Sequence, residues 1–225
     1  TLKKPQKAEF RPFPSIDSCS TFGRSTQKII SSLNSSLLRS SSPFPYFMLL
    51  SLEAGSPLRA FLLLALYPLV FLLSLCDPSL SLQIFIFIST AGLSFSQVQG
   101  VSKAVLPKFF LEDLHSQTFE VFMSCSKRYV VTSYPRVMVE YFLREHLGVD
   151  DVLGTELQVT GYGFCTGLVA RETGVLMGKR KLKAVKKLFG DEKPDIALGG
   201  RESDYPFMSF SKVTHTQNCV ISFVF

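Results

Sequence analysis

The sequence predicts an α/β fold with a parallel sheet and one apolar helical insertion, and two observations lead to this prediction. Short buried strands alternate with helices over the second half of the 225 residues, and such alternation requires crossover connections between parallel strands. A long apolar stretch interrupts this alternation after the first strand. We therefore expect a domain over residues 28–210 with its insertion at about 43–110, a flexible basic lead-in at 1–27, and a divergent tail at 211–225.

The first predicted strand ends in a polar turn. Ile29 and Ile30 lead directly into the segment Ser32-Leu33-Asn34-Ser35-Ser36. Ligands of parallel α/β proteins bind beyond the carboxyl ends of the strands. This turn is therefore the first candidate site, although it carries hydroxyls and an amide and no carboxylate.

The expected insertion contains two uncharged apolar runs, Ala60–Cys76 and Leu80–Phe95. Each is slightly shorter than the roughly 20 residues that span a bilayer, and the turn between them contains Asp77 and Pro78. Two interpretations remain open. In the first, the runs insert into a membrane as a hairpin or lie deeply buried in its interface, which suits Arg59 before the first run and makes membrane lipid a partner. In the second, they form a helix pair buried in a soluble core.

The remaining elements follow from periodicity and from the glycines at helix ends. In chain order, we expect a strand at Tyr129–Thr132, a helix from about Arg136 that Gly148 caps, a strand and hairpin within 151–170, a helix at 179–189 that Gly190 ends, and a strand at about 194–200. These strands alternate with helices, as a parallel sheet requires.

Charge and cysteine content exclude several kinds of site. The formal net charge of +6 favours an anionic partner without distinguishing lipid from nucleic acid. The basic run Gly178–Lys187 has no base-reading motif beside it, so we expect a solvated helix face and no nucleic-acid partner. The five cysteines form no CxxC pair, which argues against a disulfide framework or a zinc site. We expect no cofactor.

Polar residues at three strand ends are predicted to converge on one crevice. These segments are Ser32–Ser36, Thr132–Ser133 and Gly199–Asp204, and a lysine near the start of the helix at 179–189 joins them. The arrangement resembles the haloacid dehalogenase-like (HAD-like) phosphohydrolases. Enzymes of that kind use an Asp-x-Asp turn, a Ser or Thr at a second strand end, a lysine, and a Gly-Asp-x-x-x-Asp turn.

A more specific resemblance covers about residues 28–212. The blocks that carry it are LLRSSSPFPYFML, EAGSPLRAFLLLALYPL, KAVLPKFFLEDLHSQTFEVF, KRYVVTSYPRVMVEYFLREHLGVDDVLGTELQV and DIALGGRESDYPFMS. These blocks resemble the plant glycerol-3-phosphate acyltransferases of the cutin and suberin type. The resemblance implies a HAD-like Rossmannoid sheet, followed in family members by an acyltransferase domain. It also implies association with the endoplasmic reticulum membrane.

The resemblance assigns a role to each residue of the crevice. Ser32, Asn34 and Gly200 stand where an active phosphatase has carboxylates, and Asp204 is the remaining one. The phosphate-binding hydroxyl is implied to be Thr132 or Ser133, and the lysine is implied to be Lys181, with Lys179 as the less favoured alternative.

The missing carboxylates predict that Mg²⁺-dependent phosphatase activity is lost. A serine hydroxyl is not ionised without a base, and Asn34 has no basic site. Mg²⁺ requires anionic oxygens, which Ser32 and Gly200 do not supply, so we expect no metal. Two interpretations remain for Thr132, Ser133 and Lys181: weak binding of a phosphorylated small molecule, or a purely structural role in turns and helix ends.

The acyl-transfer motif of the family, His-x-x-x-x-Asp, has one literal match at His146–Asp151. We reject this match because His146 ends a helix and Asp151 starts the next strand. We therefore expect the acyltransferase domain to be absent, so that acyl-CoA and glycerol 3-phosphate would be partners only through that missing domain. The chain is then either the inactive HAD-like part of an acyltransferase or a non-catalytic, membrane-associated interaction module.

Overall fold

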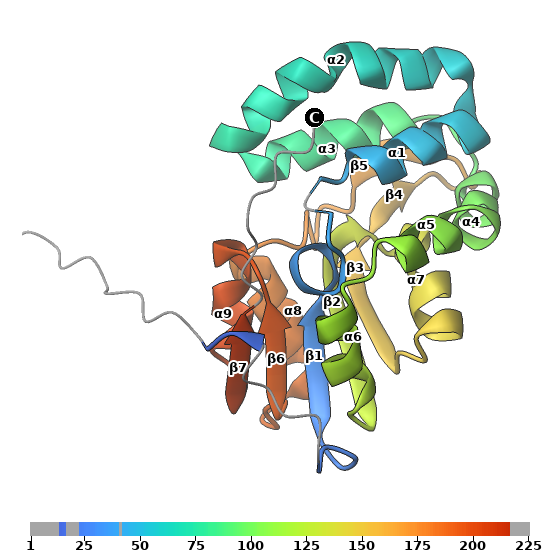
Figure 1. Ribbon diagram of the computed structural model, residues 1–225. Helices are drawn as coiled ribbons and strands as arrows, with labels where there is room; N and C mark the ends of the chain where they lie inside the picture. The colour runs from blue at the N-terminus through green and yellow to red at the C-terminus, as the bar shows by residue number, and fades with distance from the viewer. Residues whose placement is uncertain (1–13, 17–22, 41, 217–225) are drawn as a thin grey trace, which may run out of the picture.

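The computed structural model describes residues 14–16, 23–40 and 42–216, and Figure 1 shows their arrangement. Most of the predicted lead-in and residues 217–225 of the predicted tail lie outside this part. The centre of the fold is a five-stranded sheet in the order β3-β2-β1-β6-β7. Its strands are β1 (Lys28–Ser32), β2 (Lys127–Pro135), β3 (Asp151–Thr155), β6 (Ile196–Gly199) and β7 (Val213–Thr216). All neighbouring strands are parallel, as predicted.

Both faces of the sheet are buried. Successive side chains of each strand point to opposite faces, so they pack against different helices. On one face, Ile29 and Val130 pack with helices α6 (Ser116–Met123) and α7 (Arg136–Tyr141). A wider helical turn at Phe142–His146 extends α7. On the opposite face, Ile30 and Val131 pack against α8 (Lys179–Phe189) and α9 (Tyr205–Met208).

The helical insertion lies between β1 and β2, as predicted. It comprises α1 (Phe44–Leu50), a short wide turn (Ser51–Gly55), α2 (Pro57–Cys76), α3 (Pro78–Thr90), α4 (Phe95–Ala104) and α5 (Leu106–Glu112). In Figure 1 the insertion sits above the carboxyl ends of the strands. It therefore covers the edge of the sheet where the candidate site was expected.

The two apolar runs of the insertion have different surroundings. Helix α2 is long and apolar enough to cross a membrane, yet only 17% of its most apolar stretch is buried. Helix α3 is shorter, and its residues Leu82, Phe85 and Ile86 are buried in the main core. Only the second run is therefore a core helix.

The antiparallel hairpin β4 (Leu157–Val159) and β5 (Cys165–Val169) joins the insertion to the sheet domain. The Gly92 N–H donates to the Cys165 carbonyl, and the Cys165 N–H donates to the Leu93 carbonyl, both at 2.8 Å. Gly167 has a φ of +81°, and a Cβ there would lie 2.8 Å from Ala91 Cβ. A residue other than glycine would push this contact apart.

Strand β7 lies within the segment predicted as a divergent tail. Its residues pair with β6 in register from Val213 to Thr216, so the sheet continues past the expected boundary at residue 210. The outer edge of β7 is partly covered by residues 14–16 of the predicted lead-in. The Thr216 N–H donates to the Pro14 carbonyl at 2.9 Å, and Ser15 forms a parallel bridge to Thr216.

Candidate functional site

Six of the polar residues singled out in the sequence form one buried cluster at the carboxyl ends of the strands. We call this cluster the strand-end network. Its members are Ser32, Asn34, Thr132, Ser133, Lys181 and Asp204, and none exposes more than 6% of its surface. Strands β1 and β2 position the first four or lead directly into them, α8 contributes the lysine, and the turn after β6 contributes the aspartate.

An ion pair between Lys181 and Asp204 is the centre of the network. Lys181 Nζ donates to Asp204 Oδ1 at 2.7 Å and to Ser32 Oγ at 3.1 Å. The side chains of both charged residues are at most 2% exposed. Of the two candidate lysines, Lys181 reaches the end of β1 with its ammonium group, whereas Lys179 is exposed.

The second half of the network is centred on the Asn34 carboxamide oxygen. This oxygen accepts from Thr132 Oγ1 at 2.6 Å and from the Ser133 N–H at 3.1 Å. Ser133 Oγ donates to the Leu176 carbonyl at 2.9 Å. Both hydroxyls that were candidates for phosphate binding thus donate to groups of the protein itself.

The glycine turn after β6 supplies backbone groups. The N–H groups of Gly200 and Arg201 each point to Asp204 Oδ2 at 3.4 Å, a long hydrogen bond. Gly200 has no side chain to offer a ligand. At the preceding Gly199, a Cβ would lie 2.5 Å from Met208 Sδ, so this strand end is tightly packed against α9.

This donor set does not fit Mg²⁺. Octahedral magnesium sites require several anionic or neutral oxygens that are free to coordinate. In the network, the Asp204 carboxylate is paired with Lys181, the Asn34 oxygen accepts two hydrogen bonds, and the Ser32 hydroxyl accepts from an ammonium group. Within the described ranges, no group of three or more His, Cys, Asp or Glu side chains could hold a metal ion.

Sequence reasoning missed Asp113, which helps to attach the insertion to the sheet domain. The chain leaves the sheet domain at Leu38 and returns at Leu114, and these two residues form an antiparallel bridge. The Asp113 carboxylate accepts from the Ser40 N–H and from the Tyr46 hydroxyl. No motif marks this aspartate, because its role depends on two linkers that are distant in sequence.

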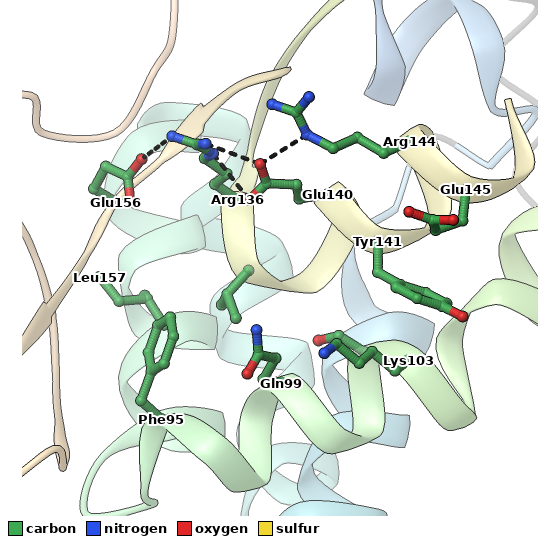
Figure 2. A pocket seen from close by; sticks show the side chains of 12 residues that line it. Phe95, Gln99, Lys103, Arg136, Glu140, Tyr141, Arg144, Glu145, Glu156 and Leu157 are labelled. Atoms are coloured by element: carbon green, nitrogen blue, oxygen red, sulfur yellow. Dashed lines mark hydrogen bonds and ion pairs between the residues drawn. The ribbon is translucent and has the colours of Figure 1, made fainter. Parts of the chain in front are cut away.

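A pocket of about 340 Å³ lies away from the strand-end network, between α4, α7 and β4. Figure 2 shows that four of its charged side chains are directed toward one another: Arg136, Glu140, Arg144 and Glu156. Arg136 donates to Glu140 and Glu156, and Arg144 also donates to Glu140. Partial burial opposes ionisation of Glu140, but the hydrogen bonds from the two arginines outweigh it and hold its pKa below the usual value.

The rejected His146–Asp151 motif lies close to this pocket. The His146 ring contacts the rings of Tyr141 and Phe142, with centroids 5.9 and 5.8 Å apart. Asp151 Oδ1 accepts from Arg144 at 3.3 Å. The two residues therefore serve local packing and an ion pair.

Comparison with known proteins identifies the family. Residues 28–217 match the family described as glycerol-3-phosphate acyltransferase RAM2-like, HAD-like domain. The chain belongs to this family. The resemblance drawn from the sequence blocks is thereby confirmed, and the match includes β7 within it.

Two curated plant proteins are similar to the chain over most of its length. The chain is 43% identical to glycerol-3-phosphate acyltransferase RAM2 of Petunia hybrida over 185 residues, which is 81% of this chain and 38% of the relative. It is 40% identical to glycerol-3-phosphate acyltransferase 1 of Arabidopsis thaliana over 183 residues, which is 78% of this chain and 30% of that protein. The chain thus spans well under half of the length of these relatives.

Solved structures confirm the HAD-like fold of this glycerol-3-phosphate acyltransferase family member. A probable phosphoserine phosphatase from Vibrio cholerae is similar with a TM-score of 0.59 and 15% identity, covering 90% of this chain and 57% of that chain. A protein of unknown function from Bordetella pertussis Tohama I is similar with a TM-score of 0.62 and 14% identity, covering 84% and 89%. At these identities the likeness concerns the fold alone.

Proposed function

We propose that this chain is the HAD-like part of a glycerol-3-phosphate acyltransferase and that this part does not hydrolyse phosphate esters. The names of the relatives support the first half of the proposal. Transfer of an acyl group from acyl-CoA to the sn-2 hydroxyl of glycerol 3-phosphate would then be the reaction of the longer protein. The HAD-like part would support that reaction structurally.

The observation that carries the second half is the hydrogen bonding of Ser32. A hydroxyl attacks phosphorus only when a base removes its proton. The Lys181 ammonium donates to Ser32 Oγ at 3.1 Å and is itself paired with Asp204. An ammonium group has no lone pair with which to remove the Ser32 proton. Its pairing with Asp204 also makes that carboxylate a weaker base.

Burial of the network supports the same proposal. The Thr132, Ser133 and Lys181 groups that could bind a phosphate are almost inaccessible to solvent, and each donates to another group of the chain. A phosphate ester would have to displace these hydrogen bonds and the covering insertion. A structural role therefore explains these contacts better than the binding of a phosphorylated small molecule.

The experiment compares two activities in two proteins. Phosphate release from glycerol 3-phosphate is measured with Mg²⁺ on this chain, and acyl transfer from acyl-CoA is measured on this chain and on a version extended by the region that follows in the relatives. We expect no phosphate release, no acyl transfer by the chain alone, and acyl transfer by the extended version. Mg²⁺-dependent phosphate release by the unmodified chain would contradict the proposal.

A matched variant tests whether the missing carboxylates are responsible. In Ser32→Asp/Asn34→Asp/Gly200→Asp, three carboxylates join Asp204, so we expect Mg²⁺ to raise the Tm of this variant and to leave the Tm of the unmodified chain unchanged.

The acyl-transfer assay separates the two candidate functions. If neither this chain nor the extended version transfers an acyl group, the result favours the alternative, a non-catalytic HAD-like interaction module.

A further inference from the structure

Helix α2 presents an unusually large apolar surface to solvent. Eight of its large apolar side chains are exposed by 39% to 75%: Leu58, Phe61, Leu62, Leu64, Leu69, Phe71, Leu72 and Leu75. Figure 1 shows α2 as the outermost layer of the insertion, on the side away from the sheet. Exposed apolar patches of this kind mark interaction surfaces in soluble proteins.

The inner side of α2 is attached to the domain along the length of the helix. Ala60, Leu63 and Val70 are buried, and Tyr67 contacts Phe44 of α1 with ring centroids 4.1 Å apart. Near the other end, Ser81 Oγ of α3 donates to the Val70 carbonyl at 3.2 Å. The helix therefore has one face in the protein and one face without a partner among the described residues.

Helix α3 cannot leave the domain to form a membrane hairpin with α2. Its Phe85 and Ile86 are at most 3% exposed, and Phe85 stacks on Phe47 with ring centroids 5.9 Å apart. Insertion of α3 into a bilayer would remove these residues from the main core. In this fold, α2 can therefore contact a membrane only while it remains packed against α3.

We propose that α2 lies in the plane of a membrane, with its outer face among the acyl chains of one leaflet and the HAD-like domain on the same side. The inference is independent of the acyl-transfer proposal. It replaces a spanning hairpin with a monotopic contact, in which one face of a helix enters the boundary between headgroups and acyl chains.

The chemistry of the outer face selects lipid over a second protein copy. The stretch from Ala60 to Cys76 has no charge, and the eight exposed side chains are six leucines and two phenylalanines. Protein interfaces need roughly one hydrogen bond per 100–200 Å² and a polar rim to fix their register. Acyl chains need neither, and they solvate leucine as well as another leucine does.

The ends of α2 fit the same arrangement. Arg59 precedes the uncharged stretch and Asp77 follows it, so charged groups stand where the helix would return to the headgroup region. The 20 residues of α2 give a length of about 30 Å. This length lies along the surface of the domain, which matches a helix parallel to the membrane plane.

Flotation of the full chain with phosphatidylcholine vesicles tests the contact. We expect the unmodified chain to float and Leu69→Gln/Leu72→Gln to bind at least about tenfold more weakly, because both leucines are more than 60% exposed and contribute transfer free energy to lipid. The matched control, Leu111→Gln/Leu168→Gln, changes two exposed leucines outside α2 and should float like the unmodified chain.

Two outcomes of the flotation experiment would overturn the proposal. One is equal flotation of the two double variants. The other is a chain that does not float but forms a stable dimer that Leu69→Gln/Leu72→Gln dissociates, since a second copy would then cover α2.

Labelling of Cys76 tests the in-plane orientation. This cysteine ends α2 and is exposed, whereas Cys125 and Cys165 are buried. In the variant Cys19→Ser/Cys219→Ser bound to sealed vesicles, a membrane-impermeant maleimide added outside should label Cys76 without detergent. Protection of Cys76 until detergent is added would place the end of α2 on the far side of the bilayer and would overturn the proposal.

Discussion

The carboxylate of Asp113 holds the backbone N–H of Ser40, with Oδ1 and Oδ2 at 3.1 and 3.0 Å from the nitrogen. This contact fastens the linker that enters the helical insertion to the linker that leaves it. Because the Tyr46 hydroxyl donates to the same carboxylate, helix α1 is fixed at the same point. Asp113 thus ties both linkers and α1 together at one point, beside the Leu38–Leu114 bridge.

We expect Asp113→Ala to loosen the insertion before it affects the sheet. Loss of hydrogen bonds to a carboxylate should lower the free energy of unfolding by about 2 kcal/mol. Native-state hydrogen exchange should show faster exchange at Ser40 and in α1, while amides of β1 keep their protection. Asp113→Asn, which keeps an acceptor oxygen, is the control, and equal acceleration of exchange in β1 would contradict this role.

The ion pair in the strand-end network gives a second prediction. Lys181→Met leaves the Asp204 carboxylate buried without its cation and should lower the free energy of unfolding by about 3–5 kcal/mol. Lys181→Met/Asp204→Asn removes both charges, so most of this loss should be recovered. Urea denaturation measures both variants, and a double variant that is as unstable as the single one would show that packing of the lysine, rather than its charge, matters.

Two glycines of the β4–β5 hairpin form a matched pair of test sites. Gly163 and Gly167 have φ values of +82° and +81°, but only Gly167 has atoms close to the position of an added Cβ. We expect Gly163→Ala to cost about 1 kcal/mol from backbone strain alone. Gly167→Ala should cost about 2–4 kcal/mol, because Ala91 and Phe87 of the insertion must also move. Equal losses in thermal denaturation would argue against the close contact between α3 and β5.

Burial of Tyr134 predicts a loss of stability in alkaline solution. Burial raises the pKa of its phenol to about 12, although Asn34 and Arg201 partly oppose the shift. The folded pKa lies above the unfolded value near 10, so this contribution is complete below pH 10 and is lost as the pH rises toward 12. The expected loss is about 3 kcal/mol in the free energy of unfolding. Urea titrations at several pH values measure this loss. Between pH 10 and 12, the free energy of unfolding should fall less for Tyr134→Phe than for the unmodified chain.

The arrangement of the sheet could be predicted because local signals agree with the tertiary fold. Ile29 and Ile30 form a strand buried on both faces, and Gly190 ends α8 with a φ of +57°. The convergence of Ser32, Thr132 and Asp204 at one edge of the sheet could also be predicted, because the carboxyl ends of parallel strands lie at the same edge. The pairing of Lys181 with Asp204 could not be predicted, since it depends on how α8 packs beside β6.

The sequence pattern of the two apolar runs could not predict which of them is buried in the core. Both runs are apolar on all sides, so periodicity does not separate a buried helix from an exposed one. Burial of Phe85 and exposure of Leu69 become visible only once the insertion is placed over the sheet. Likewise, Asp113 carries no recognisable motif because its partners lie 73 and 67 residues earlier.

The pairing of residues 14–16 with β7 has a consequence for how the molecule avoids aggregation. An uncovered edge strand offers free backbone donors and acceptors to another chain. Here Ser15 bridges to Thr216 and the Pro14 carbonyl accepts from the Thr216 N–H, so part of that edge is already occupied. Proteolytic removal of the first 27 residues would leave the β7 edge open to intermolecular strand pairing.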